Sequence, residues 1–331
     1  MADTKLSQTF YDAIAKNRWR TAFLFTLFPA MLLAILYLGS FILMAFSGSG
    51  YGDATTQTGN LFFTLSPWII GGSILWMIVM VFSGKNMILS LSGAHPIKKS
   101  DAPELYRIVE NLAIRTGIKT PRVFVMEDDS LNAFATGYSP DKAAVTVTRG
   151  ILKKLIPAEL EAVLAHEFGH IINRDTRTML VAITMTGIIQ LIADMILRSL
   201  WFSGRSRGGR SHGDDKSGAI VFLAIIAVWI IGFIGAILVQ LGISRKRELL
   251  ADAESAYLTR NPQGLITALE KITADPRVEQ LDGKRSIAAL CIADPLEAGN
   301  QSLLDSLQSL FGTHPSTKNR IKELRRMMVA T

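Results

Sequence analysis

Residues 157–173 read PAELEAVLAHEFGHIIN and carry the strongest structural signal in the chain. A proline suits the first turn of a helix, and apolar residues then recur at helical spacing. His166 and His170 are four residues apart, so on a helix both imidazoles face one side and can bind one metal ion. Glu167, beside them, can take a proton from an attacking water. The stretch therefore predicts the metal-binding helix of a hydrolase rather than two unrelated surface histidines.

A third metal ligand is expected from a carboxylate. Catalytic zinc sites use three protein ligands and leave a fourth position open. No further histidine follows His170 closely enough to complete a longer histidine motif. Glu248 is the best candidate, because Glu248 and Asp252 are four residues apart and share one face of a second expected helix. One of them can ligate the metal while the other holds a ligand imidazole. The alternative is a solvated charge cluster after a hydrophobic segment.

Three short β-strands are expected before the metal-binding helix. They lie at 121–126, 131–136 and 144–148, and residues 137–142 form the turn between the last two. A helix is expected at 103–114, where apolar residues recur at helical spacing. As an edge strand, 131–136 can pair through its backbone with an extended peptide, although a purely structural strand fits the pattern equally well.

The composition of the chain indicates an integral membrane protein. Of 331 residues, 49% are hydrophobic and 19% charged, whereas soluble domains average about 25% charged residues. Residues 21–84 contain one charged side chain, Asp53. Collagen-like, disordered and disulfide-stabilised classes are excluded, and the single Cys291 is expected to be a core residue. Four apolar segments reach the roughly 20 residues that span a bilayer, namely 21–49, 59–84, 178–197 and 218–244.

The distribution of basic residues predicts the orientation. Lys and Arg precede the first apolar segment and are frequent after the second, but the loop between the two has none. By the positive-inside rule, the N-terminus and the polar region from residue 85 lie in the cytoplasm, at the cell (inner) membrane. The net charge of +7 has the same explanation, and in the absence of a nucleic-acid-binding motif no nucleic-acid partner is expected.

The chain is expected to comprise five segments. They are a cytoplasmic N-terminal segment (1–20), a transmembrane hairpin (21–84), a polar segment with the metal-binding helix (85–177), a second apolar hairpin (178–244) with a flexible basic loop (198–217), and a cytoplasmic helical segment (245–331) that completes the metal site. A spanning second hairpin puts the basic loop outside, against the positive-inside rule, whereas a hairpin that does not cross keeps it inside. The long uncharged stretch 218–244 favours crossing.

The sequence resembles the HtpX-type membrane zinc metallopeptidases, which are related to the CAAX prenyl endopeptidases. The resemblance rests on the histidine motif, the Glu-x-x-x-Asp pair, the order of the segments and three further motifs. These motifs are LNAFATG at 131–137, Asn-Arg-Asp at 173–175 and Thr-His-Pro at 313–315. The resemblance covers nearly the whole chain. It implies a mainly α membrane protein, in which transmembrane helices accompany a cytoplasmic zincin-like α+β protease domain with a small sheet.

The resemblance also implies a role for each matching residue. The implied ligands of one zinc ion per chain are His166, His170 and Glu248. The implied catalytic groups are Glu167, as the base, and His314, as a donor to the oxyanion. The residues implied to support the ligands are Asp252 and Asn173. The residues implied to contact the substrate are Asn132, Ala133, Phe134, Ala135 and Arg320, the last over the oxyanion.

The expected function is that of a membrane-bound zinc-dependent endopeptidase that hydrolyses misfolded or membrane proteins at the cytoplasmic face, in protein quality control and the stress response. Its partners are then polypeptide substrates and the lipid bilayer. Zinc is expected at the membrane surface, since His170 and Glu248 lie about 12 Å and about 6 Å of helix from the nearest apolar segments. A CAAX-type prenyl endopeptidase and a zinc-stabilised scaffold without proteolytic activity are the alternatives. A transporter, suggested by Gln190 and Asp194 in an apolar segment, leaves the histidine motif unexplained.

Overall fold

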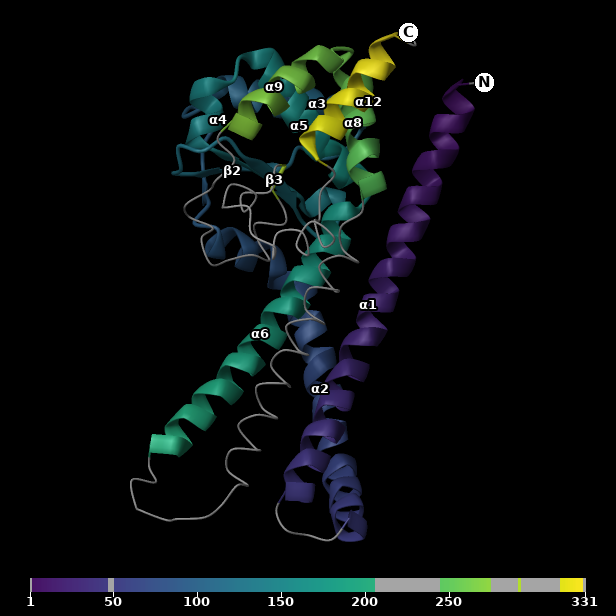
Figure 1. Cartoon of the computed structure of the whole chain (residues 1–331). Helices are drawn as coiled ribbons and strands as arrows, with labels where there is room; N and C mark the ends of the chain where they lie inside the picture. Colours follow the sequence, from purple (N-terminus) through teal and green to yellow (C-terminus); the bar gives the residue numbers. More distant parts are fainter. Residues whose placement is uncertain (1, 47–50, 206–244, 275–290, 293–315, 330–331) are drawn as a thin grey trace. The chain divides into compact units, whose positions relative to one another are not determined.

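The computed structural model describes residues 2–46, 51–205, 245–274, 291–292 and 316–329 (Figure 1). The chain forms two compact units. The first consists of Met1–Thr21, Val81–Ile183 and Val239–Thr331, and the second of Ala22–Met80 and Thr184–Leu238. The expected mainly α architecture with a small sheet is confirmed, and the sheet and the helix that carries His166 and His170 both belong to the first unit.

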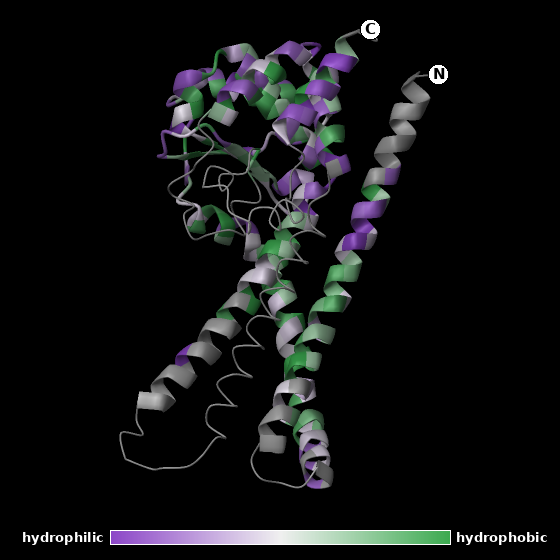
Figure 2. Ribbon diagram, viewed as in Figure 1, coloured by the Kyte–Doolittle hydropathy of each residue, from purple (hydrophilic) through white to green (hydrophobic). Residues whose placement is uncertain are grey.

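Two helices in the described part of the chain are long and apolar enough to cross a membrane, α1 (Ala2–Phe46) and α2 (Tyr51–Leu91). The candidate spans within them are Ile14–Phe41 and Thr55–Leu91. Figure 2 shows mostly hydrophobic residues along the coloured parts of the two candidate spans. The two helices begin before the apolar segments predicted from the sequence, because hydropathy marks the part of a helix that lipid can surround and not the residue at which the helix begins.

The third apolar segment, 178–197, is helical and lies within α6 (Asp175–Arg205). Residues 198–205 also continue this helix, so the prediction that a flexible loop begins at residue 198 is wrong. The physical reason is that leucine, tryptophan and phenylalanine at 200–202 prolong the apolar run. The fourth segment, 218–244, and the remainder of the basic loop lie outside the described residues.

A four-stranded mixed sheet lies in the first unit, with the order β1-β2-β4-β3. The central strands run parallel, with Arg122 opposite Ala144, whereas β3 pairs antiparallel with β4, with Ala133 opposite Val147. Among the described residues β3 pairs only with β4, so it is an edge strand of this sheet, as the sequence suggested. The bounds are β1 (His95–Pro96), β2 (Arg122–Met126), β3 (Ala133–Thr136) and β4 (Ala144–Thr148).

Three helices of the first unit, at 103–116, 245–259 and 262–274, pack against α5 (Pro157–Ile172), which begins at the expected proline and also contacts β3. The side chains of Val163, Leu164 and Phe168 on α5 are fully buried in the core. The helix expected at 103–114 is α3 and continues for two further residues. The other bounds are α3 (Pro103–Thr116), α4 (Arg149–Lys154), α8 (Arg245–Thr259), α9 (Pro262–Ala274) and α12 (Thr317–Val329).

A glycine allows α5 and α8 to approach each other closely. A Cβ atom on Gly169 would lie 3.3 Å from Cα of Ala251 and 2.4 Å from Oε2 of Glu254, both on α8. Glycine in a helix interior costs about 1 kcal/mol relative to alanine. The close approach explains why this cost is tolerated, and it brings the start of α8 to the histidines of α5.

Candidate metal centre

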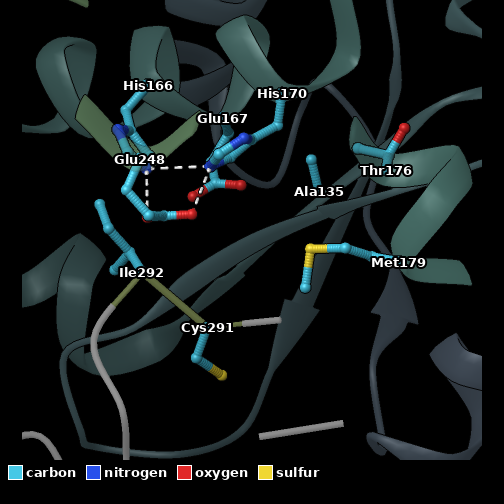
Figure 3. A pocket seen from close by; sticks show the side chains of 9 residues that line it. All are labelled: Ala135, His166, Glu167, His170, Thr176, Met179, Glu248, Cys291 and Ile292. Atoms are coloured by element: carbon cyan, nitrogen blue, oxygen red, sulfur yellow. Dashed lines mark hydrogen bonds and ion pairs between the residues drawn. The ribbon is translucent and has the colours of Figure 1, made fainter. Parts of the chain in front are cut away.

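Three side chains from α5 and α8 converge on one point (Figure 3). The Nε2 atoms of His166 and His170 are 3.2 Å apart. The carboxylate of Glu248 lies 3.7 Å from the first of these atoms and 3.6 Å from the second. Ligand atoms in tetrahedral zinc sites, with bonds of 2.0–2.2 Å, are separated by about 3.3–3.5 Å. The spacing of the three donors therefore fits a tetrahedral cation with one coordination position left open.

The far side of each imidazole is held by a buried carboxylate. Nδ1 of His166 lies 2.9 Å from Asp252, and Nδ1 of His170 lies 3.0 Å from Asp175. A carboxylate in this position keeps the proton on Nδ1 and leaves the lone pair of Nε2 for a metal. Two such imidazoles and one carboxylate form a donor set that suits Zn²⁺.

The electrostatics of the centre favour positive charge. Burial alone would lower the pKa of His170, but the carboxylates of Glu248 and Asp175 outweigh burial and raise the pKa to about 9. Burial likewise opposes ionisation of Asp252, yet the neighbouring Arg320 guanidinium and the His166 ring hold its pKa below the ordinary value. The carboxylates around the imidazoles therefore attract a cation, whether a proton or a metal ion.

Glu167 lies at the same centre, between α5 and the edge strand. Its side chain is 2% exposed, and burial raises the pKa of its carboxyl group above the usual range. The backbone of Ala135 on β3 opposes this rise of the pKa. The pocket in Figure 3 is lined by Ala135, His166, Glu167, His170, Thr176, Met179, Glu248, Cys291 and Ile292. Cys291 is buried, as expected, but it also lines this pocket.

The expected substrate-binding strand presents its outer edge to this pocket. The carbonyl of Ala133 accepts a hydrogen bond from the N–H of Ile292 at 3.1 Å. The N–H of Ala133 donates to the side-chain oxygen of Asn132 at 3.0 Å. Phe134 is buried opposite Thr146 of β4. Ala133 and Ala135 are therefore the residues whose backbone groups face away from β4.

Arg320 lies behind His166. Its guanidinium donates two hydrogen bonds to Asp252, at 2.9 and 2.7 Å, and one to the carbonyl of Ile292 at 2.8 Å. These contacts place Arg320 on the Nδ1 side of His166, away from the Nε2 atoms that meet at the centre. These contacts make Arg320 a support for Asp252. The position over the oxyanion, which the resemblance implies for Arg320, stays a prediction. His314 lies outside the described residues.

The turn after α5 carries a group of polar residues that the sequence analysis largely missed. Asn173 ends α5 and donates a hydrogen bond to the buried Glu254 at 2.7 Å. Asp175, which holds His170, also accepts hydrogen bonds from Asn17 of α1 and Arg247 of α8. Of these residues only Asn173 was expected to support the ligands. The Asn-Arg-Asp motif was the available signal for Asp175.

The chain is similar to known proteins over most of its length. The model of "Peptidase family M48" matches residues 99–328. A protein named "Protease HtpX homolog" from Bacteroides fragilis is 38% identical, over 93% of this chain and 95% of its own length. A protein of the same name from Lactobacillus helveticus is 39% identical, over 96% of this chain and 99% of its own length. The crystal structure of S. mikatae Ste24p, at 20% identity and a TM-score of 0.45, covers 90% of this chain and 63% of that chain.

Proposed function

The chain belongs to peptidase family M48 and is a membrane metalloprotease, and from this premise we propose that it is a zinc-dependent endopeptidase acting on misfolded or membrane proteins. The proposed location is the cytoplasmic face of the cell (inner) membrane, and the proposed role is protein quality control. One observation carries the proposal: His166, His170 and Glu248 converge at zinc-like spacing beside a buried Glu167.

The proposed ligands and the proposed base have separate tasks. When bound, zinc supplies Lewis-acid chemistry, which polarises a peptide carbonyl and makes water more acidic. Glu167 takes the proton of the attacking water and delivers it to the leaving amine. Its position beside the three proposed ligands suits both steps, because a general base must lie within reach of the proton that it takes. His314 is proposed, by resemblance, to donate to the oxyanion.

The edge strand β3 is proposed to hold the substrate as an added strand. Asn132, Ala133, Phe134 and Ala135 contribute to this edge, and the outward backbone groups belong to Ala133 and Ala135. Main-chain pairing gives affinity without strong selection for substrate side chains, which suits a protease of misfolded proteins. At Ala133 the substrate must exchange the hydrogen bond that Ile292 now donates.

The activity is tested by separating metal binding from proteolysis. Purified full-length protein is analysed for zinc and for cleavage of casein and a model membrane substrate, with and without a chelator. We expect about one zinc per chain and chelator-sensitive cleavage. Glu167→Gln retains the metal but loses cleavage by at least about 100-fold, as removal of a general base predicts. Glu161→Gln, on the same helix but paired with Arg115, is the matched control and changes neither.

Two results contradict the proposal. Cleavage retained by Glu167→Gln removes the assigned base. Zinc binding without any proteolysis by the wild-type chain favours the scaffold instead.

The five-segment organisation of the sequence analysis is also proposed, with the basic loop beginning after Arg205 and both apolar hairpins crossing the bilayer. A cysteine introduced at Ser211, in a chain whose Cys291 is replaced by alanine, tests the second hairpin. An impermeant thiol reagent applied from outside labels this cysteine if the hairpin crosses. Absence of labelling from outside, with labelling after the membrane is permeabilised, contradicts the crossing.

A further inference from the structure

Three cationic side chains from separate parts of the first unit meet where the apolar stretch of α2 ends. Lys85 is the first charged residue after that stretch. Arg122 begins β2, and its backbone N–H donates a hydrogen bond of 3.2 Å to the carbonyl of Ala143, the residue after Lys142 in the 3-10 turn Pro140–Lys142. Both cations lie close enough to Lys85 to repel it. Nζ of Lys142 also lies 5.9 Å from the ring centroid of Phe82, one turn before Lys85. The three cations therefore form one cluster, here called the basic cluster.

The basic cluster has no acidic partner in the described part of the chain. Many other cations of the same unit form ion pairs with carboxylates, for example Arg149 with Glu127 and Lys153 with Asp129. None of the three cluster residues does so within the described ranges, and the adjacent Asp141 is exposed. Like charges held together without a counter-charge repel one another, so an anion bound among them lowers the free energy of the folded chain.

The position of the cluster along α2 indicates which anion it meets. The candidate span Thr55–Leu91 has 37 residues. Its length of about 55 Å exceeds the roughly 30 Å of a hydrocarbon core, so one end must extend into the headgroup layer. The C-terminal end of this span, from Lys85 onward, is its charged end. We therefore expect the basic cluster to lie in the headgroup layer, where the lipid phosphates are.

Aromatic side chains that contact basic residues of the first unit support the same depth. Phe82 is 73% exposed. Tyr138, in the chain between β3 and Lys142, lies under the guanidinium of Arg177 at 4.5 Å. Aromatic residues next to Lys and Arg are typical of the membrane–water interface.

We propose that Lys85, Arg122 and Lys142 bind the phosphate of an anionic phospholipid at the membrane surface. Lys142 closes the turn that follows the edge strand β3, so a lipid bound here holds that strand at a fixed height above the bilayer. The binding site is separate from the metal centre and does not depend on the proposed proteolytic activity.

The test measures lipid retention by the full-length protein. Wild type is reconstituted in phosphatidylcholine nanodiscs containing a minor fraction of phosphatidylglycerol, then released and examined by native mass spectrometry. The triple variant Lys85→Gln, Arg122→Gln and Lys142→Gln is compared with a matched triple, Lys318→Gln, Lys322→Gln and Arg326→Gln on α12, which loses the same charge. We expect the wild type and the α12 triple to retain phosphatidylglycerol, and the cluster triple to lose at least about tenfold in retention, since each basic residue near an anionic surface contributes about fivefold.

Two controls keep the outcome decisive. Lys142→Gln alone changes one exposed side chain and is expected to lose about fivefold in retention without altering thermal stability, so a folding defect of the triple does not obscure the result. Soluble glycerol 3-phosphate distinguishes a lipid from a free phosphate. The proposal is overturned if both triples retain phosphatidylglycerol equally, if wild type retains no more of it than of phosphatidylcholine, or if glycerol 3-phosphate displaces it at equal concentration.

Discussion

Nδ1 of His170 lies 3.0 Å from Oδ2 of Asp175, although the two residues belong to different helices. The chain reverses between them at Arg174, whose φ of 59° is left-handed. Non-glycine residues adopt this conformation at a cost of about 1 kcal/mol or more. This turn places Asp175, the first residue of α6, beside His170 on α5. The strained backbone of Arg174 therefore helps to orient the His170 imidazole.

Replacing Asp175 by asparagine tests this support. The variant leaves Nδ1 of His170 without an anionic partner, and we expect zinc affinity to fall by about 10- to 100-fold. Competition with a fluorescent zinc chelator measures the affinity. Asp129→Asn, which removes an exposed carboxylate paired with Lys153, is the control and should bind zinc like wild type. Unchanged affinity in Asp175→Asn shows that the contact does not tune the metal.

Gly169→Ala should separate α8 from α5. The added Cβ would lie 3.3 Å from the backbone of Ala251 and 2.4 Å from Glu254, so overpacking should destabilise the protein by about 1–3 kcal/mol and weaken zinc binding through Glu248. Thermal unfolding and zinc content measure the two effects. Gly187→Ala on α6, where a Cβ meets nothing within 4 Å, should be neutral or slightly stabilising. Equal behaviour of the two variants contradicts the close-approach explanation.

Glu254 should make stability depend on pH. Burial raises the pKa of this carboxyl group from 4.5 to about 8, and within the described residues its Oε2 has no hydrogen-bond partner. Between these pH values the unfolded chain has released a proton that the folded chain retains, so stability falls as pH rises from about 4.5 to 8 and then levels off. Glu254→Gln removes this loss, which amounts to a few kcal/mol as an order of magnitude.

The comparison needs unfolding midpoints at several pH values. The advantage of Glu254→Gln over wild type should be small near pH 5 and largest at or above about pH 8. Glu270→Gln, at an exposed position on α9, provides the control and should show no such trend. An advantage that is the same at every pH would mean that Glu254 is already ionised in the folded protein at low pH.

Arg320 should matter more for stability than any exposed arginine of α12. Arg320→Ala leaves the charge of Asp252 buried and without its guanidinium partner, at a cost of about 3–5 kcal/mol. Arg320→Lys keeps the charge but cannot reproduce the planar pair of hydrogen bonds, so we expect an intermediate loss. Arg325→Ala removes only an exposed pair with Glu270 and should cost below about 1 kcal/mol. Similar unfolding midpoints for the two alanine variants would refute the supporting role.

Short-range spacing predicted the parts of the site that lie within one element. The i, i+4 pairs on α5 and α8 bring His166 to His170 and Glu248 to Asp252, and β4 has the bounds expected from its sequence. The need of the two histidines for a third ligand pointed to Glu248 on the second helix, and the resemblance supported this link.

The remaining features depend on contacts between distant segments or on single backbone angles. The position of Arg320 depends on packing of the C-terminal helix against α8, and the role of Asp175 depends on the left-handed Arg174. The sheet order, in which β4 separates β2 from β3, is also invisible to local periodicity. Hydropathy located apolar stretches but not helix ends, since α6 runs on to Arg205.

Because α5 precedes α8 in the sequence, the candidate metal centre can form only after α8 has been synthesised. A chain still emerging from the ribosome, complete only as far as Arg205, already contains both imidazoles, whereas the acid on α8 has not yet been made. Such an intermediate lacks Glu248, one of the three proposed metal ligands, and we expect it to bind a metal ion weakly. On the proposed assignment of the ligands, hydrolytic competence therefore waits until the C-terminal portion has been synthesised, and a product that ends before α8 lacks it.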